Sequence, residues 1–261
     1  MQTRLDALLA EYPHFPMKER LILLGYRGSI AHGTYLPKND PAHTDDKDVM
    51  GIAIPPREYY FGLRQFEGWD KQRDEWDVVI YEFRKMIRLL VKSNPNVLCL
   101  LWLEPNHYII RTETGNVLID NRHLFLSREI YKSFLGYAHS QMSRMTKFKF
   151  EGYMGEKRKA LVDKFGYDCK NASHLIRLLR MGIECLSTGE LNVMRHDSTE
   201  LIAIKHGEWT LEQVKAEAKR LFIKAEDTLS RSPLQIKPDY EAVNVLCTEI
   251  LSEKFLLTRD V

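Results

Sequence analysis

The chain has 261 residues, of which 44% are hydrophobic and 28% charged, an ordinary composition for a globular protein. Its formal net charge of +2 is too small to imply nucleic-acid binding by itself. No stretch approaches the roughly 20 apolar residues that a membrane helix needs, so we expect no membrane association and a cytoplasmic location. The four cysteines are widely scattered, which favours reduced thiols over disulfides or a zinc site.

The N-terminal half of the sequence predicts a mixture of helices and strands. A short helix is expected at residues 1–10, where prolines at positions 13 and 16 follow it. β-Branched, aromatic and other apolar residues predict three strands, at residues 20–26, 49–54 and 76–81. Apolar side chains recur on one helical face in residues 82–92, and the apolar segment 97–103 is also expected to be helical.

From about Leu126 onward, amphipathic helical patterns dominate the sequence. The clearest predicted helices are residues 130–145, 172–186, 211–229 and 240–256. The sequence therefore predicts an α+β protein in which an N-terminal half with strands precedes a helical C-terminal half. We place the division near residues 121–127 and predict two domains, 1–123 and 124–261.

A glycine–serine pair and two closely spaced aspartates are the most informative residues of the chain. Gly28 and Ser29 follow the first predicted strand, and such a turn is suited to binding an anionic triphosphate. Asp46 and Asp48 stand one residue apart in a segment expected to be extended. Residues at i and i+2 of a strand point to the same face, so both carboxylates can bind the same pair of magnesium ions.

Asp77 is an isolated acid within the third predicted strand, WDVVIY. A third carboxylate there would hold the catalytic ion near an attacking hydroxyl and help to remove its proton, whereas burying it without a partner would be costly. Two other interpretations remain open: residues 45–48 form a solvated acidic turn, or Asp77 faces water at a strand edge. The order of the features, namely strand, Gly-Ser, Asp-x-Asp and strand aspartate, favours metal-dependent nucleotidyl transfer.

This ordered pattern resembles the DNA polymerase beta nucleotidyltransferase superfamily, and within it the RlaP-type predicted nucleotidyltransferases. The resemblance lies in GSIAHGT (28–34), DKDVMGI (46–52), DVVIYEFRKMIRLLVKSNPNVL (77–98), GYDCKNASHLIRLLRMG (166–182) and TGELNV (188–193). It implies a polymerase-beta-like core, a small mixed sheet with flanking helices, followed by a helical C-terminal domain. It also implies that Ser29 contacts the triphosphate of an NTP and that Asp46, Asp48 and Asp77 bind two Mg²⁺ ions, which Mn²⁺ could replace.

Two positions depart from the pattern of this family. A serine or threonine is expected directly before the first catalytic aspartate, but here Asp45 stands between Thr44 and Asp46. An acid is expected after the segment NPNVL, but this chain has Cys99. Any role of an acid at that second position is therefore not carried over to this protein.

A basic stripe is predicted on one face of a helix in the C-terminal half. Lys170, His174 and Arg177 fall on this face, with Arg180 beside it. Packed against the catalytic half, the stripe would bind the triphosphate or a substrate phosphate. Two alternatives remain open: an ordinary solvated helix face, or buried arginines paired with carboxylates such as Glu82.

Residues 144–164 form a basic segment with interleaved aromatic residues. Such a composition can follow a phosphate backbone and stack exposed bases. If an RNA end enters the protein, we expect it to pass here and to contact Lys147, Lys149 and Lys157. The alternative is a surface loop held by a few anchoring aromatics.

These features together predict a magnesium-dependent nucleotidyltransferase that moves a nucleoside monophosphate from an NTP to a hydroxyl and releases pyrophosphate. The expected acceptor is RNA, either a tRNA end or another RNA under repair. One alternative is transfer to a small molecule or a protein side chain. Another is a non-catalytic nucleotide-binding or sensor module, against which the three retained carboxylates argue, since a pure binder has no need for clustered negative charge.

Overall fold

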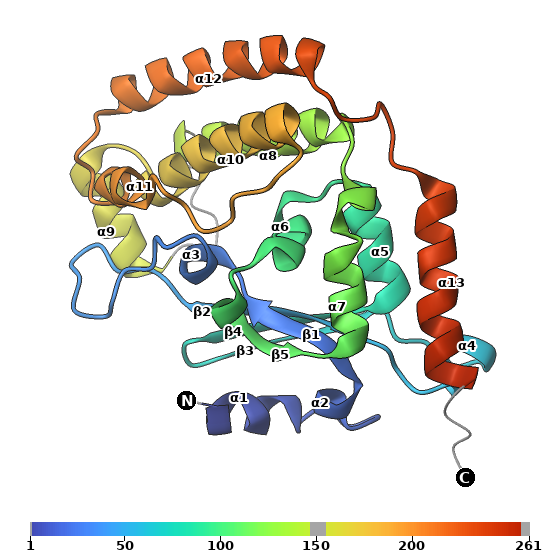
Figure 1. The fold of residues 1–261 in the computed structure, drawn as a ribbon. Helices are drawn as coiled ribbons and strands as arrows, with labels where there is room; N and C mark the ends of the chain where they lie inside the picture. Colours follow the sequence, from blue (N-terminus) through green and yellow to red (C-terminus); the bar gives the residue numbers. More distant parts are fainter. Residues whose placement is uncertain (1, 147–154, 257–261) are drawn as a thin grey trace.

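The computed structural model describes residues 2–146 and 155–256, which form a five-stranded sheet with helices on both faces (Figure 1). The strands are β1 (Leu21–Tyr26), β2 (Lys47–Ala53), β3 (Gly68–Arg73), β4 (Trp76–Glu82) and β5 (Tyr108–Arg111). The helices of the first half are α1 (Gln2–Leu9), α2 (Met17–Arg20), α3 (Gly28–Ala31), α4 (Glu58–Phe61), α5 (Phe83–Val91), α6 (Pro95–Leu98) and α7 (Glu113–Asp120), with 3₁₀ turns η1 (Cys99–Trp102), η2 (Pro105–His107) and η3 (Arg122–Phe125). The second half is helical, with α8 (Glu129–Thr146), α9 (Glu156–Phe165), α10 (Cys169–Thr188), α11 (Ser198–Lys205), α12 (Leu211–Arg231) and α13 (Tyr240–Leu256).

The sheet has the strand order β3-β4-β2-β1-β5, and its central pair, β2 and β4, is parallel while the other pairs are antiparallel. In the parallel pair Asp48 lies opposite Asp77, Met50 opposite Val79, and Ile52 opposite Tyr81. Alternate residues of a strand share one face. One face of the sheet therefore carries the two aspartates at one end of the parallel pair and apolar side chains farther along.

The two faces of the sheet belong to two different hydrophobic clusters. Trp76, Val78 and Ile80 of β4 pack with α1 and α2 beneath the sheet. Met50 and Ile52 of β2 point to the opposite face and join a larger cluster with the helices above it. That larger cluster includes buried side chains from both sides of residue 123, so the two halves share one core. The division into domains 1–123 and 124–261 stays a prediction.

Helix α10 is the centre of the helical layer, because α8, α11 and α12 all pack against it. Its predicted apolar face is confirmed, since Leu175, Leu178 and Leu179 are fully buried. Asp168 caps its N-terminus by accepting a hydrogen bond from the backbone N–H of Asn171. Across the described residues, no helix is both long enough and apolar enough to span a bilayer.

The sequence pattern predicted the inner strands and the long helices but not the two edge strands. The three predicted strands and the long C-terminal helices are confirmed, although β2 begins at Lys47, so Asp46 precedes the strand. The segment 97–103 is helical, but it is divided into α6 and η1. The pattern missed β3 and β5, the two edge strands: β3 is largely exposed, with the polar sequence GWDKQR, and β5 has only four residues. Neither has the sustained alternation of apolar and polar residues by which a strand is recognised in a sequence.

Candidate active site

The predicted carboxylates meet at one end of the parallel strand pair. Asp48 and Asp77 are neighbours across β2 and β4, and their side chains are 26% and 33% exposed. Burial raises the pKa of Asp48 to about 6, and the negative charges of Asp77 and Asp46 add to the rise, against the opposing effect of Arg27. The structure therefore brings the three predicted acids into one electrostatic environment. Asp48 is half-buried rather than part of a solvated turn, and Asp77 is half-buried on a strand that lies between β2 and β3.

Arg27 places a positive charge within reach of both strand aspartates. Its Nη2 lies 2.7 Å from Oδ2 of Asp77 and 4.0 Å from Oδ1 of Asp48. Its backbone N–H also donates to the carbonyl of Asp48, which fixes the end of β1 beside β2. The sequence pattern did not distinguish Arg27, because an arginine directly before a glycine is common in any sequence.

Gly28 and Ser29 form the turn that follows β1, and Gly28 lies against the Asp48 carboxylate. Gly28 has a φ of +61°, and a Cβ atom at this position would lie 2.4 Å from Oδ2 of Asp48. A side chain here would therefore displace the carboxylate. Ser29 is 6% exposed, and its buried Oγ has no hydrogen-bond partner among the described residues. Buried hydroxyls are rarely left unpaired, so this one is available to a ligand oxygen.

Asp45, the residue that departs from the family pattern, is the centre of a buried ion cluster. Its side chain is 1% exposed and lies 2.8 Å from Nζ of Lys205 and 3.0 Å from Nζ of Lys170. It also accepts a hydrogen bond from the backbone N–H of Leu36 at 3.1 Å. Although burial alone would raise the pKa of Asp45, the two lysines hold it below its usual value. Asp45 is therefore a buried anion that neutralises cations of the helical half.

The two lysines that contact Asp45 also bind the backbone of the loop that leads to the aspartates. Lys170 on α10 donates to the carbonyl of Thr44, and Lys205 on α11 donates to that of Thr34, both at 2.7 Å. The predicted ligand role of Lys170 stays a prediction, and the contacts of its ammonium group are to this loop. Lys205 was missed by the sequence analysis, because only the fold brings it to Asp45.

Arg177 carries a buried charge and makes no ion pair with a carboxylate among the described residues. It is 7% exposed, and its Nη1 contacts the sulfur of Met181 at 3.2 Å. Burial lowers its pKa to about 10, and Cys99 and Arg177 lie close enough to influence each other's ionisation. An acid in place of Cys99 would offset this charge. The second departure from the family pattern thus places a thiol, rather than a carboxylate, near Arg177.

Two histidines lie beside this cation and stay neutral near pH 7. Burial, followed by the charge of Arg177, lowers the pKa of both His174 and His32 well below its ordinary value. His32 follows the Gly28–Ser29 turn, and its Nδ1 donates to the carbonyl of Val193 at 3.0 Å. The structure therefore brings His174 and Arg177 close to one another and to His32, which belongs to the segment carrying Ser29.

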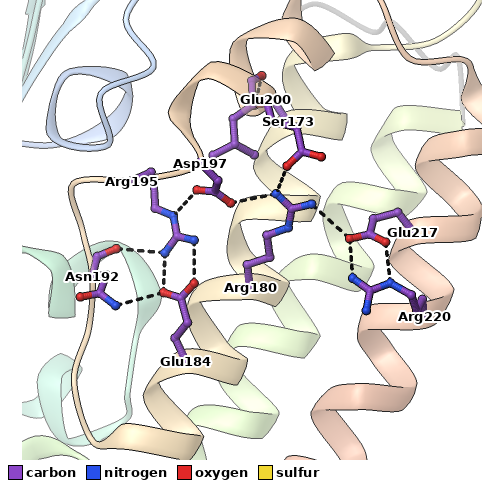
Figure 2. A network of polar contacts seen from close by, with 10 residues as sticks. Ser173, Arg180, Glu184, Asn192, Arg195, Asp197, Glu200, Glu217 and Arg220 are labelled. Carbon is purple, nitrogen blue, oxygen red and sulfur yellow. Dashed lines mark hydrogen bonds and ion pairs between the residues drawn. The ribbon is translucent and has the colours of Figure 1, made fainter.

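Arg180, next to the predicted stripe, belongs to a network of ion pairs rather than to the site. Figure 2 shows its guanidinium between the carboxylates of α11, α12 and the preceding loop, namely Glu200, Glu217 and Asp197. Arg195 connects Asp197 to Glu184 of α10 in the same network. The alternative of buried arginines paired with carboxylates is thus confirmed for Arg180. Its partners differ from the suggested Glu82, which accepts a hydrogen bond from Tyr60.

The basic segment 144–164 is described only in part. Lys147 and Lys149 lie outside the described residues, so their predicted RNA contacts stay predictions. Lys157 lies on α9, and its Nζ is 3.5 Å from the carbonyl oxygen of Asp40, in the loop between α3 and β2. The described end of this segment therefore faces the loop that leads to Asp46 and Asp48.

The chemistry of the carboxylates suits magnesium, but the described residues do not form a finished metal site. Carboxylate oxygens are the hard ligands that Mg²⁺ and Mn²⁺ prefer. Within the described ranges, no three His, Cys, Asp or Glu side chains are placed to hold a metal ion together. The ion pair of Asp77 is made with Arg27. Asp46, Asp48 and Asp77 could hold a divalent ion, provided that the Arg27 guanidinium gives way.

Comparisons with known proteins identify the family of the chain. The model of the RlaP family, described as an RNA repair pathway DNA polymerase beta family, matches residues 1–249. The chain belongs to the RlaP family. A solved structure of a nucleotidyltransferase-like protein from Exiguobacterium sibiricum is similar over 99% of this chain and 79% of its own, with 11% identity and a TM-score of 0.32. No curated protein matches the chain. This RlaP protein thus has the polymerase-beta-type nucleotidyltransferase core with a helical C-terminal region that its motifs predicted.

Proposed function

We propose that this RlaP protein is a magnesium-dependent nucleotidyltransferase that transfers the NMP part of an NTP to a hydroxyl of RNA. The main support is the placement of Gly28 directly against the carboxylate of Asp48, which itself lies beside Asp77. The turn that contains the unpaired, buried hydroxyl of Ser29 thus lies beside the two strands that carry Asp48 and Asp77. This combination puts a phosphate-binding group next to the ligands of a divalent ion.

Each residue of the site has a defined role in this reaction. Ser29 donates its unpaired hydroxyl to a phosphate oxygen, and Arg177 and His174 provide positive charge and a hydrogen-bond donor for the triphosphate. Asp46, Asp48 and Asp77 would hold Mg²⁺, which neutralises charge on the phosphate oxygens. Asp77 would receive the proton of the attacking hydroxyl. The new bond joins that oxygen to the α-phosphorus, and the bond from the α-phosphorus to the oxygen shared with the β-phosphate breaks to release pyrophosphate.

The RNA acceptor is supported by the family and by the position of the basic segment. The matching family is associated with RNA repair. Lys157, at the described end of the basic segment, lies against the loop that leads to Asp46. Transfer to a small molecule or to a protein side chain uses the same chemistry, and the experiment below distinguishes the acceptors.

The test is to incubate the protein with Mg²⁺, each NTP labelled at the α-phosphate, and total RNA. We expect the wild type to label RNA, and Asp48→Asn and Asp77→Asn to lose at least 100-fold in rate, since positioning and charge neutralisation carry this type of reaction. Asp74→Asn, a matched change in the β3–β4 turn, should keep the wild-type rate. Label on protein or on small molecules would mean that these, and not RNA, are the acceptor. NTP binding without any transfer would favour a non-catalytic sensor.

A further inference from the structure

An open groove of about 460 Å³ lies between α5 and α13, and none of the roles above uses it. The groove follows residues 84–92 of α5 and 240–251 of α13, so it is roughly 12–17 Å long at 1.5 Å per helical residue. Helix α5 begins directly after the end of β4, whereas Asp77 lies near the start of that strand. The groove is therefore separate from the aspartates, on the side of the molecule where α13 lies (Figure 1).

The floor of the groove is formed by apolar side chains that recur along both helices. Ile87 and Val91 of α5 are 5% and 7% exposed, and Val243 of α13 is 4% exposed. Cys247 and Leu251 continue the row on α13, each about one helical turn after the side chain before it. Rows at this spacing on two neighbouring helices leave a channel into which the side chains of a third helix can pack. The shape of the groove therefore fits a helix.

Three cations, Arg84, Arg88 and Lys92, form the wall of the groove on α5. They stand four residues apart, so they lie on one face of the helix, and like charges at this spacing repel one another. Arg84 is partly engaged, since it lies 3.6 Å from the carboxylate of Glu82 and over the ring of Tyr60. The repulsion along this wall would be relieved by an anion bound from outside.

The two cations farther along this wall can pair with an acidic partner. Arg88 and Lys92 are exposed, and neither makes an ion pair among the described residues. The acid that Arg88 influences, Glu67, is paired with Lys85 at 3.0 Å. No described acid lines the groove, and the residues of α13 that line it are uncharged. Carboxylates of a partner would therefore meet positive charge without a competing acid, which favours their association.

The apolar floor favours a protein partner over RNA. Single-stranded RNA binds through aromatic side chains that stack its bases along a basic track. Here Tyr240, at one end of the groove, is the only aromatic residue among those described that line it. Amphipathic helices bind by placing their apolar face in a groove of this kind, and an exposed apolar groove with polar edges is typical of a protein interaction site.

We propose that the groove between α5 and α13 binds an acidic amphipathic helix of a partner protein. The apolar face of that helix packs on Ile87, Val91 and Val243, and its carboxylates pair with Arg88 and Lys92. The interaction does not depend on the proposed transferase activity, because the groove and the aspartates use different residues.

The test uses a fluorescein-labelled synthetic peptide of about 14 residues, roughly the length of the groove when helical, with leucines on one helical face and glutamates beside them. In a matched peptide, lysine replaces each glutamate. We expect the acidic peptide to bind about tenfold more tightly in fluorescence anisotropy, and Arg88→Glu/Lys92→Glu to remove this preference. Lys219→Glu/Lys224→Glu, the same charge change at exposed positions of α12, should keep it. Equal wild-type affinity for both peptides, or an unchanged preference in Arg88→Glu/Lys92→Glu, would overturn the proposal.

Cys247 shows whether the peptide occupies the groove, because it lines the groove and is partly exposed, whereas the other three cysteines are buried. Saturating acidic peptide should slow the alkylation of Cys247 by iodoacetamide about fivefold, measured by mass spectrometry, because the bound helix covers the thiol. A scrambled peptide of the same composition should give no protection, and equal protection by it would contradict docking of an amphipathic helix. Protection by an RNA oligonucleotide but not by the acidic peptide would overturn the proposal in favour of RNA.

Discussion

At the scale of single residues, Ser29 is the side chain whose surroundings most directly point to a ligand. Its hydroxyl is buried and unpaired, whereas the buried hydroxyl of Ser173 donates to the carbonyl of Leu201 at 2.9 Å. We expect Ser29→Ala to leave the free energy of unfolding within about 0.5 kcal/mol of the wild type, because no hydrogen bond is lost. NTP binding should weaken about tenfold, as measured by calorimetry.

Ser173→Ala is the matched control for this prediction. Since it breaks an existing hydrogen bond, it should cost about 1 kcal/mol in stability and leave NTP affinity unchanged. A Ser29→Ala protein that is destabilised as much as Ser173→Ala and binds NTP normally would show that Ser29 has a structural role only.

The sequence alone identified some residues of the candidate site but not the partner of Asp77. Asp46, Asp48, Asp77, Gly28 and Ser29 were recognised because their spacing follows a strand and a turn, and the structure places them together. The partner of Asp77 could not be recognised in this way, since an arginine beside a glycine is common in any sequence. Its importance comes from the 2.7 Å contact that the sheet creates.

At the scale of elements, the ion-pair network around α10 and α11 makes a prediction about acid stability. Burial favours the neutral form of Asp197, but hydrogen bonds from Arg195 and Arg180 dominate and hold its pKa at about 2. Because this pKa is lower than in the unfolded chain, the stabilisation is present above about pH 4 and is lost as the pH falls towards 2. The contribution is about 2 kcal/mol.

Asp197→Asn should therefore be less stable than the wild type at neutral pH, and the difference should shrink between about pH 4 and pH 2. Urea unfolding at a series of pH values measures it. Asp227→Asn, which breaks an exposed ion pair with Arg231 on α12, should change little at any pH. A stability difference for Asp197→Asn that stays constant down to pH 2 would contradict the assigned role of this carboxylate.

At the scale of the whole molecule, Asp45 connects the N-terminal half, which contains the sheet, to the helical C-terminal half through ion pairs. It is buried between Lys170 of α10 and Lys205 of α11, and both lysines also donate hydrogen bonds to carbonyls of the loop between α3 and β2. We expect Asp45→Asn to lower the free energy of unfolding by about 3 kcal/mol, because it leaves buried ammonium groups without their anion. Differential scanning calorimetry should still show one transition, since the core is shared by both halves.

Glu58→Gln is the control for this change, because it removes an exposed ion pair with Arg64 and should cost less than 1 kcal/mol. Two separate transitions, in the wild type or in Asp45→Asn, would mean that the two predicted domains unfold independently. A loss below about 1 kcal/mol in Asp45→Asn would mean that the buried ion cluster does not hold the halves together.

The sequence by itself determined the buried strands, the long helices and the chemistry of the carboxylate pair, because these depend on short-range periodicity and on residue type. The sequence did not predict β3, because this exposed edge strand has no alternation of apolar and polar residues. It also could not show that Lys205 pairs with Asp45 or that the buried Arg177 makes no ion pair among the described residues. These depend on contacts between residues far apart in the chain. Only the tertiary structure decided which lysines Asp45 neutralises and that the buried Arg177 makes no ion pair with a carboxylate among the described residues, because burial and ion pairing are properties of the packed molecule.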